Sequence, residues 1–188
     1  MSNITKKELT DLIANPELNK RIADFQNKIN QQPPDDWLRQ HPFIKNYLYL
    51  PIARVEFLLR SIFQRWEWKV VDFRIVANAI AVHGTLRVLD PITNEWLSYD
   101  GLGAVDIQLK AGSNATDFTQ ITANAIMKNL PAAESYALKD AAEKIGTIFG
   151  GDLNRKDEIN FQSPYSRWKD ENELTKLETT NEIGRAHV

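Results

Sequence analysis

The longest periodic run of apolar positions in the chain lies between Pro131 and Gly151. Apolar residues recur there at spacings of three and four, which places them on one side of a helix; they are Leu138, Ala141, Ala142, Ile145, Ile148 and Phe149. Pro131 suits the first turn, and Gly150-Gly151 suits the end, where glycine readily adopts a left-handed conformation. The pattern therefore predicts one long amphipathic helix that begins at Pro131, contains Gly146 and ends at Gly150.

Upstream, the apolar period changes to two. Apolar and other residues alternate over 69–76 and 80–88, with Val71, Phe73 and Ile75 on one side of the first segment. A turn over 90–94 leads to a third segment that starts at Glu95 and runs into Gly101-Leu102-Gly103. Alternation of this kind is typical of strands, and short connections require antiparallel neighbours. We therefore expect a three-stranded antiparallel meander.

Helical spacing returns on both sides of this meander. Residues 52–65 have five apolar positions on one side and are followed by Trp66-Glu67-Trp68, which we expect to close the helix; the five are Val55, Leu58, Leu59, Ile62 and Phe63. Residues 118–130 are predicted to form a short helix before the long one. Together these elements predict an α+β domain in which the long amphipathic helix packs on the sheet.

The two ends of the chain differ from this centre. Residues 5–31 are polar and helical in pattern, interrupted or restarted at Pro16, and Pro33-Pro34 marks a break. After Asn160 the chain is polar and acidic, with Trp168 as its one large apolar anchor. We therefore divide the chain into an N-terminal helical segment (1–36), a core domain (37–160) and a C-terminal tail expected to be flexible (161–188).

The amino-acid composition excludes some classes of protein. The 188 residues include no cysteine, which excludes disulfides and thiolate metal sites, and no apolar run approaches the roughly 20 residues of a membrane span. The first residues lack the apolar core of a signal peptide, so we expect a cytoplasmic protein without membrane contact. The net charge is only −2, but residues 37–87 hold eight basic and three acidic residues, a net charge of +5. This segment is a candidate surface for a polyanion, or a set of scattered solvated charges.

Three stretches, in order, resemble the single-strand annealing proteins of the Rad-fifty-two superfamily, which includes phage annealases of the Sak and Erf kinds and the bacterial end-protecting protein DdrA. The first is Tyr49-Leu-Pro-Ile-Ala-Arg54-Val55 with its helix and Trp66 or Trp68. The second is Leu86-Arg87-Val88 followed by Gly101-x-Gly103, and the third is Ala137-Leu-Lys139-Asp140-Ala-Ala-x-x-Ile145-Gly146-x-x-Phe149-Gly150. The resemblance covers roughly residues 37–155.

The resemblance implies a homo-oligomeric ring or helical assembly that holds single-stranded DNA in a basic groove and anneals complementary strands without ATP or any cofactor. By position, Arg39, Tyr49 and Lys139 match residues of that groove. Asp140 and Glu143 stand where the eukaryotic relative is basic. The outer DNA site of that family finds no convincing match here, although Arg74, Arg87 and Lys110 lie nearby in the sequence. A single-strand binding protein or an exonuclease is the expected accessory partner.

Each of these residues also has an ordinary structural interpretation. Lys139 with Glu143, and Asp140 with Lys144, have the spacing of surface ion pairs on a helix. Arg54, also a candidate DNA contact, fits a structural ion pair or an interface better, Tyr49 fits a core aromatic, and Arg39 fits a solvated surface.

Three other functions remain open at this point. The first is protection of single-stranded ends without annealing. The second is a Mg²⁺-dependent nuclease, because Pro34-Asp35 with Glu67-x-Lys69 loosely matches the carboxylate and lysine pattern of a large nuclease class. The third is a purely protein-binding module with an exposed sheet edge. No glycine-rich phosphate loop or nucleophile elbow is present in the sequence to support a hydrolase.

Overall fold

The computed structural model describes residues 15–41, 44–114 and 116–155. Residues 31–155 form one compact unit, and α2 (Pro16–Ile29) belongs to the other and is considered by itself. The side chain of Asn15 caps α2 by accepting a hydrogen bond from the Leu18 N–H (3.1 Å), and Pro16 follows in the first turn. Pro16 therefore opens a helix, because its missing N–H would have no partner there. The expected tail with Trp168 lies outside the described residues.

The compact unit is α+β, as the periodicities predict. It contains the 3-10 helix η1 (Asp35–Trp37), the short strands β1 (Arg39–Gln40) and β2 (Leu48–Tyr49), and the helix α3 (Ile52–Ile62). The meander follows as β3 (Trp66–Val76), β4 (Ala79–Leu89) and β5 (Trp96–Asp106). The helix α4 (Ala125–Glu143) lies between the 3-10 helices η2 (Phe118–Gln120) and η3 (Thr147–Phe149).

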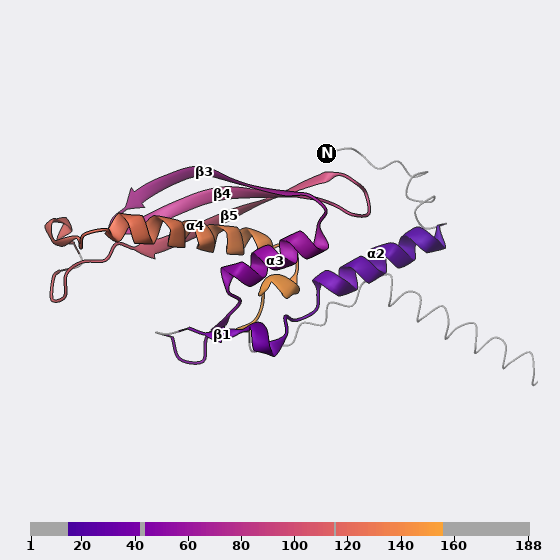
Figure 1. The fold of residues 1–188 in the computed structure, drawn as a ribbon, viewed down its shortest axis with the longest axis horizontal. Coiled ribbons are helices and arrows are strands. Elements are labelled where there is room, and N and C mark those ends of the chain that lie inside the picture. The colour runs from indigo at the N-terminus through magenta and orange to yellow at the C-terminus, as the bar shows by residue number, and fades with distance from the viewer. Residues whose placement is uncertain (1–14, 42–43, 115, 156–188) are drawn as a thin grey trace, which may run out of the picture. The chain divides into compact units, whose positions relative to one another are not determined.

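The three long strands form one antiparallel sheet in the order β3-β4-β5 (Figure 1). Burial alternates along the central strand as predicted, with Ile80, Val82, Leu86 and Val88 all buried. In register, Val82 of β4 lies opposite Gly103 of β5. The core therefore lies on one face of the sheet, where Ile80 and Val82 cluster with the small residues Ala133 and Ala137 of α4.

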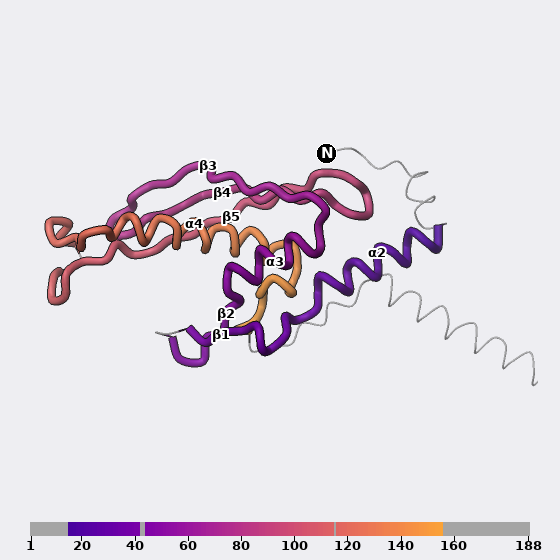
Figure 2. Tube along the Cα trace, viewed as in Figure 1, coloured from indigo at the N-terminus to yellow at the C-terminus, as the bar shows by residue number. Residues whose placement is uncertain are grey.

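Helix α4 covers β4 and β5 on this face, and the tube in Figure 2 shows it running along the sheet. The close approach depends on two glycines of β5. A Cβ atom at Gly101 would lie 2.8 Å from the Ala141 Cβ, and one at Gly103 would lie 2.9 Å from the Tyr136 carbonyl carbon. Any larger residue would push the helix off the strand, so the Gly-x-Gly spacing sets how tightly the two elements pack.

Several predicted boundaries are wrong. The long helix begins six residues before Pro131, which is the seventh residue of α4. A proline at this position leaves the carbonyl of Met127 without its helical donor, a loss that water can compensate because Met127 is exposed. Residues 118–130 are accordingly not a separate helix. They contain the 3-10 turn η2 and the start of α4.

The other end of α4 and the end of α3 also differ from the prediction. Helix α4 ends at Glu143, Gly146 is in extended backbone outside it, and Gly150 (φ 100°) closes η3 instead. Phe63 is already extended after α3, so Trp66 and Trp68 begin β3 rather than close the helix. Phe149 is nevertheless fully buried, as its place in the apolar pattern requires.

Candidate nucleic-acid interface

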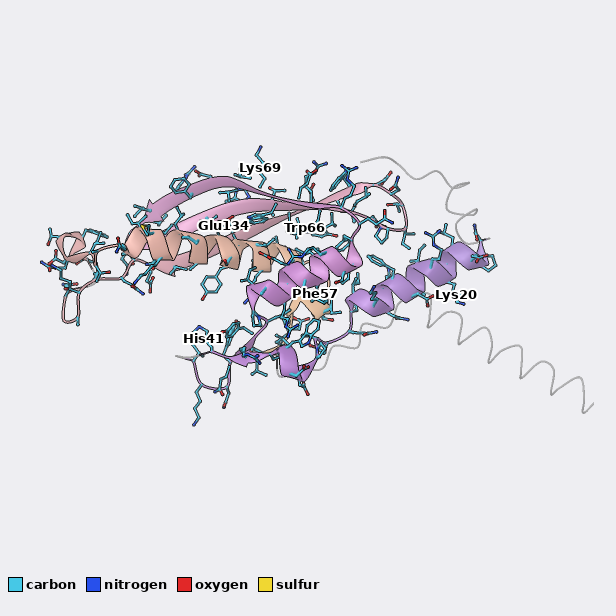
Figure 3. The ribbon with its side chains drawn as sticks, in the orientation of Figure 1. Lys20, His41, Phe57, Trp66, Lys69 and Glu134 are labelled. Carbon is cyan, nitrogen blue, oxygen red and sulfur yellow. The ribbon has the colours of Figure 1, made fainter. Side chains whose placement is uncertain are left out.

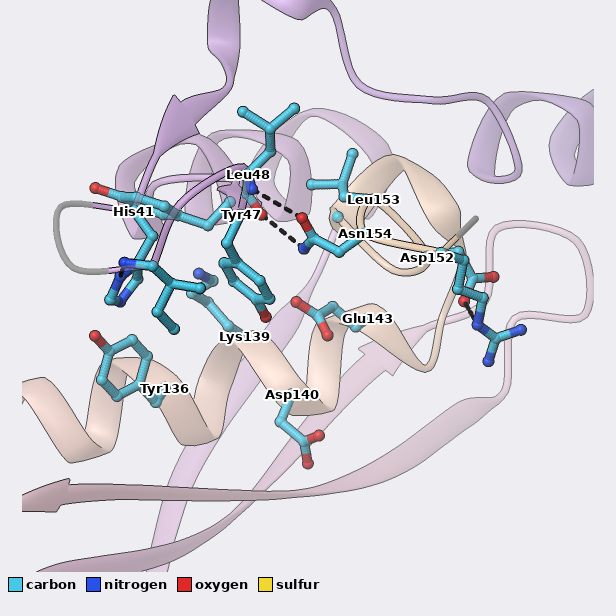
Figure 4. A pocket seen from close by; sticks show the side chains of 14 residues that line it. His41, Tyr47, Leu48, Tyr136, Lys139, Asp140, Glu143, Asp152, Leu153 and Asn154 are labelled. Atoms are coloured by element: carbon cyan, nitrogen blue, oxygen red, sulfur yellow. Dashed lines mark hydrogen bonds and ion pairs between the residues drawn. The ribbon is translucent and has the colours of Figure 1, made fainter. Parts of the chain in front are cut away.

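A cleft of about 710 Å³ lies between the segment around β2, the polar side of α4 and the residues that follow η3 (Figure 4). It is lined by His41, Ile44, Tyr47, Leu48, Tyr49, Tyr136, Lys139, Asp140, Glu143, Gly150, Asp152, Leu153, Asn154 and Arg155. Tyr49 and Lys139, two of the residues that the sequence singled out, therefore belong to one site although ninety residues separate them.

Local hydrogen bonds shape the wall that carries Tyr49. Strands β1 and β2 pair antiparallel with Arg39 opposite Tyr49, and the His41 N–H donates to the Tyr47 carbonyl at 2.7 Å. Asn154, which follows η3, connects this wall of the cleft to the last residues of the compact unit. Its amide accepts from the Leu48 N–H (2.8 Å) and donates to the Leu48 carbonyl (2.9 Å), so one side chain pairs with β2 as a neighbouring strand would.

The ammonium group of Lys139 lies among aromatic rings. Its Nζ is 4.9 Å from the ring centroid of Tyr49 and 5.8 Å from that of Tyr136, distances at which cation–π attraction operates. Burial lowers the pKa of Lys139, and the nearby Glu143 carboxylate partly opposes that effect. The lysine is thus a cation with a poor hydration shell, which favours contact with an anion brought into the cleft.

Aromatic side chains also line the cleft. Tyr47 and Tyr136 are both exposed, and the His41 ring meets the rings of Tyr47 and Tyr49 edge to face, at centroid distances of 5.8 and 6.2 Å. Exposed rings held in this way by their neighbours offer flat faces on which a planar ligand can stack.

Three carboxylates also line the cleft, and two of them already have cationic partners. Asp140 accepts from the Lys144 ammonium (2.9 Å) and from the backbone N–H of Leu102 (3.0 Å), so it ties α4 to β5. Asp152 pairs with Arg155 at 2.7 Å. Desolvation raises the pKa of Glu143, and the charge of Lys139 opposes that shift. The charge of Glu143 acts on Lys139, so the ionised form of Glu143 opposes the binding of an anion at that ammonium group.

The remaining candidate residues lie outside this lining. Arg39 is exposed on β1, and its guanidinium donates to the carbonyls of Asp36 (3.1 Å) and Leu38 (3.0 Å). The guanidinium of Arg54 lies over the Trp37 ring at 4.6 Å. Arg39 is thus next to Tyr49 and beside the cleft, whereas Arg54 packs on an aromatic surface.

The three candidates for an outer site are separated from the cleft. Arg74 pairs with Asp72 at 2.6 Å, and Arg87 pairs with Glu67 at 3.1 Å and lies over the Trp96 ring at 4.7 Å. Lys110 is exposed in the segment after β5. Arg74 and Arg87 project from the sheet face opposite α4, because their register partners Ala81 and Ser98 alternate with the buried positions.

The residues of the nuclease pattern do not lie on neighbouring strands, the arrangement expected of that nuclease class. Asp35 lies in η1, whereas Glu67 and Lys69 lie on β3, whose neighbour in the sheet is β4. In Figure 3, Lys69 and Glu134 lie on opposite sides of the sheet. Within the described residues no group of three or more His, Asp or Glu side chains could hold a metal ion.

Sequence reasoning missed several residues of the cleft. Tyr136 precedes Lys139 by three positions and so shares its side of a helix, a spacing that could have identified it. His41 and Tyr47 belong to a turn whose path the sequence does not indicate. Asn154 follows the last predicted element, and nothing in its neighbours signals a bond to Leu48.

Comparison with known protein families and with curated proteins gave no match to this chain. In the part of the chain that the structure describes, no helix is long and apolar enough to cross a membrane.

Proposed function

We propose that this protein binds single-stranded DNA in the cleft between β2 and α4 and anneals complementary strands without ATP, acting as a homo-oligomer. The observation that carries the proposal is the position of the Lys139 ammonium, within 5 Å of the Tyr49 ring centroid and beside the exposed ring of Tyr136. A cation and stacking surfaces in one open cleft are the two features that sequence-independent binding of single strands uses.

The role proposed for each residue follows from the chemistry of its side chain. Lys139 would neutralise a backbone phosphate, which carries no information about sequence. Tyr47 and Tyr136 would stack on bases, a contact worth about 1–3 kcal/mol per base. Stacking uses the faces of the bases and leaves their pairing edges free, which is the condition for annealing.

One subunit supplies few such contacts. Binding by one cation and two rings is weak alone, and the carboxylate of Glu143 weakens it further. When several subunits contact one strand, each additional contact forms within a tethered complex and the affinities combine. A homo-oligomer is therefore part of the proposed mechanism, and it agrees with the assembly that the resemblance implies.

Binding is tested by fluorescence anisotropy of a labelled oligothymidylate across a range of salt concentrations. Lys139→Ala is expected to weaken binding and to reduce the slope of log affinity against log salt by about 0.7 for each lost phosphate contact. Lys69→Ala is the matched control, because it removes the same charge from an exposed site on the opposite side of the sheet. If both variants lose affinity equally, the cleft is not the binding site.

Annealing is tested with two complementary labelled oligonucleotides without ATP, with and without Mg²⁺. The expected result is salt-sensitive pairing of intact strands, impaired in Arg39→Ala and Lys139→Ala. Binding without pairing would instead indicate end protection. Shortened strands that appear only with Mg²⁺ would indicate the nuclease residues Asp35, Glu67 and Lys69. Absence of binding at low salt would contradict the proposal and favour a protein-binding module.

A further inference from the structure

Strand β3 has an apolar row that helix α4 leaves uncovered. Phe73 lies opposite Val82 and Ile75 lies opposite Ile80, so both side chains are on the face of the sheet that holds the core. Helix α4, however, packs over β4 and β5. Phe73 and Ile75 are consequently 59% and 58% exposed, and Val71, at the bulge in the same strand, is 52% exposed. Three exposed apolar residues within five positions of one strand can mark an interaction surface.

The same strand is an edge of the sheet. Among the described residues its one strand neighbour is β4, so its other side presents backbone N–H and C=O groups to the surroundings. The features that usually prevent an exposed strand edge from pairing with another strand are weak here. The bulge between Val70 and Asp72 interrupts the regular pairing at one point, and the segment from Val71 to Ile75 contains no lysine or proline.

The sequence of this segment is complementary to itself when read in opposite directions. Centring an antiparallel pair of copies on Phe73 places Phe73 opposite Phe73 of the second copy. Val71 then faces Ile75, and Asp72 faces Arg74, and each of these pairs occurs twice. Asp72 and Arg74 already lie within 2.6 Å of each other along the strand, and their register partners His83 and Ala81 place both on the face opposite α4.

We propose that β3 pairs antiparallel with β3 of a second copy of this chain across a two-fold axis at Phe73, which joins two meanders into one six-stranded sheet. The apolar rows of the two strands form a single patch on the α4 side of the sheet. The charges form two reciprocal ion pairs on the other side. An isologous contact of this kind requires a self-complementary surface, and the pattern from Val71 to Ile75 meets that condition.

This contact is independent of DNA binding. None of the residues that line the cleft belongs to β3. The proposal therefore stands or fails separately from the proposed function, and its test uses the protein without nucleic acid.

The register is tested by disulfide cross-linking, which is direct because the wild-type chain has no cysteine. Phe73→Cys places the new thiol opposite its own copy, at a separation between directly opposed strand residues that a disulfide can span. Ile75→Cys is the matched control, because it faces Val71 and its own copy is four residues away along the strand. The double variant Val71→Cys/Ile75→Cys should cross-link again.

The expected result is rapid covalent dimer formation by Phe73→Cys and by the double variant under mild oxidation, and roughly tenfold slower formation by Ile75→Cys. Equal rates for the two single variants, or no dimer from Phe73→Cys at high protein concentration, would overturn the proposal. Absence of a dimer from Phe73→Cys would indicate instead that a strand from a different protein pairs with this edge.

Charge reversal gives a second, independent test in the Phe73→Cys background. Asp72→Arg alone or Arg74→Asp alone sets like charges opposite each other twice, and cross-linking should slow roughly tenfold. Combining the two substitutions restores opposite charges and should restore the rate. Single variants that react as fast as the parent, or a double variant that stays slow, would contradict the pairing.

Discussion

The glycines of β5 permit a sharp test of how the site is positioned. In Gly101→Ala the new Cβ atom would overlap the carbonyl oxygen of Ala137 and would lie 2.8 Å from the Ala141 Cβ. Carbon atoms in contact are usually about 3.5–4.0 Å apart, so α4 would have to move away from the sheet by roughly 1 Å. The obstructing atoms include backbone, which cannot rotate out of the way as a long side chain can.

The cost follows from the packing of the core. Overfilling a close-packed interior usually costs about 1–3 kcal/mol, and a backbone obstruction favours the upper part of that range. With a urea dependence of about 1–3 kcal/mol per molar, the unfolding midpoint should fall by roughly 1–2 M. The measurement is urea unfolding followed by tryptophan fluorescence, since the Trp68 ring packs against the core that would expand.

Leu102→Ala is the control for this substitution. Leu102 is the next residue of the same strand and is 67% exposed, so its truncation should change the free energy of unfolding by less than about 0.5 kcal/mol. If Gly101→Ala unfolds at the same urea concentration as Leu102→Ala, then α4 does not depend on the glycines for its close approach to β5.

Two further predictions concern the cleft and the core. The pKa of Glu143 is raised in the folded protein by desolvation, so the stability that its protonated form provides is lost as the pH rises above about 4.5 and through the folded pKa. Glu143→Gln should remove this pH-dependent loss of stability, as measured by urea unfolding at several pH values. It should also tighten DNA binding roughly threefold or more in fluorescence anisotropy. If neither the stability nor the affinity changes, the assigned role of Glu143 is wrong. Asn129→Ala should cost about 1–3 kcal/mol in urea unfolding, because its buried amide donates to the Asp106 carbonyl at 2.6 Å. The exposed Gln108→Ala is the control, and an equal effect of the two would refute the argument.

The sequence predicts the sheet well because burial on one face imposes a period of two. Ile80, Val82, Leu86 and Val88 are all buried where the alternation places them. It predicts helix ends poorly, because those depend on tertiary contacts. Pro131 is tolerated within α4 where water can replace its missing donor, and α4 stops at Glu143 although the apolar spacing continues to Phe149.

The candidate site likewise contains residues that the sequence could identify and residues that it could not. Lys139 and Tyr49 could be selected from the sequence, and they meet in the cleft. Asn154 could not be selected, because its importance comes from a hydrogen-bonded contact with Leu48 across more than a hundred residues. Arg74 and Arg87 carry the right charge, but each is paired on the opposite face of the sheet, which no local pattern reveals. The face of a side chain follows from the register, and the register follows from the whole sheet.

The two proposals have a geometric consequence when they are taken together. The two-fold axis of an antiparallel strand pair is perpendicular to the sheet, and α4, whose residues line the cleft, lies along that sheet. A rotation of 180° about such an axis reverses any direction in the plane of the sheet. Two DNA strands that each follow α4 would therefore run in opposite directions, which is the polarity that complementary strands must have to pair. If the protein anneals DNA as proposed, pairing of β3 would thus give it two clefts already arranged for antiparallel strands.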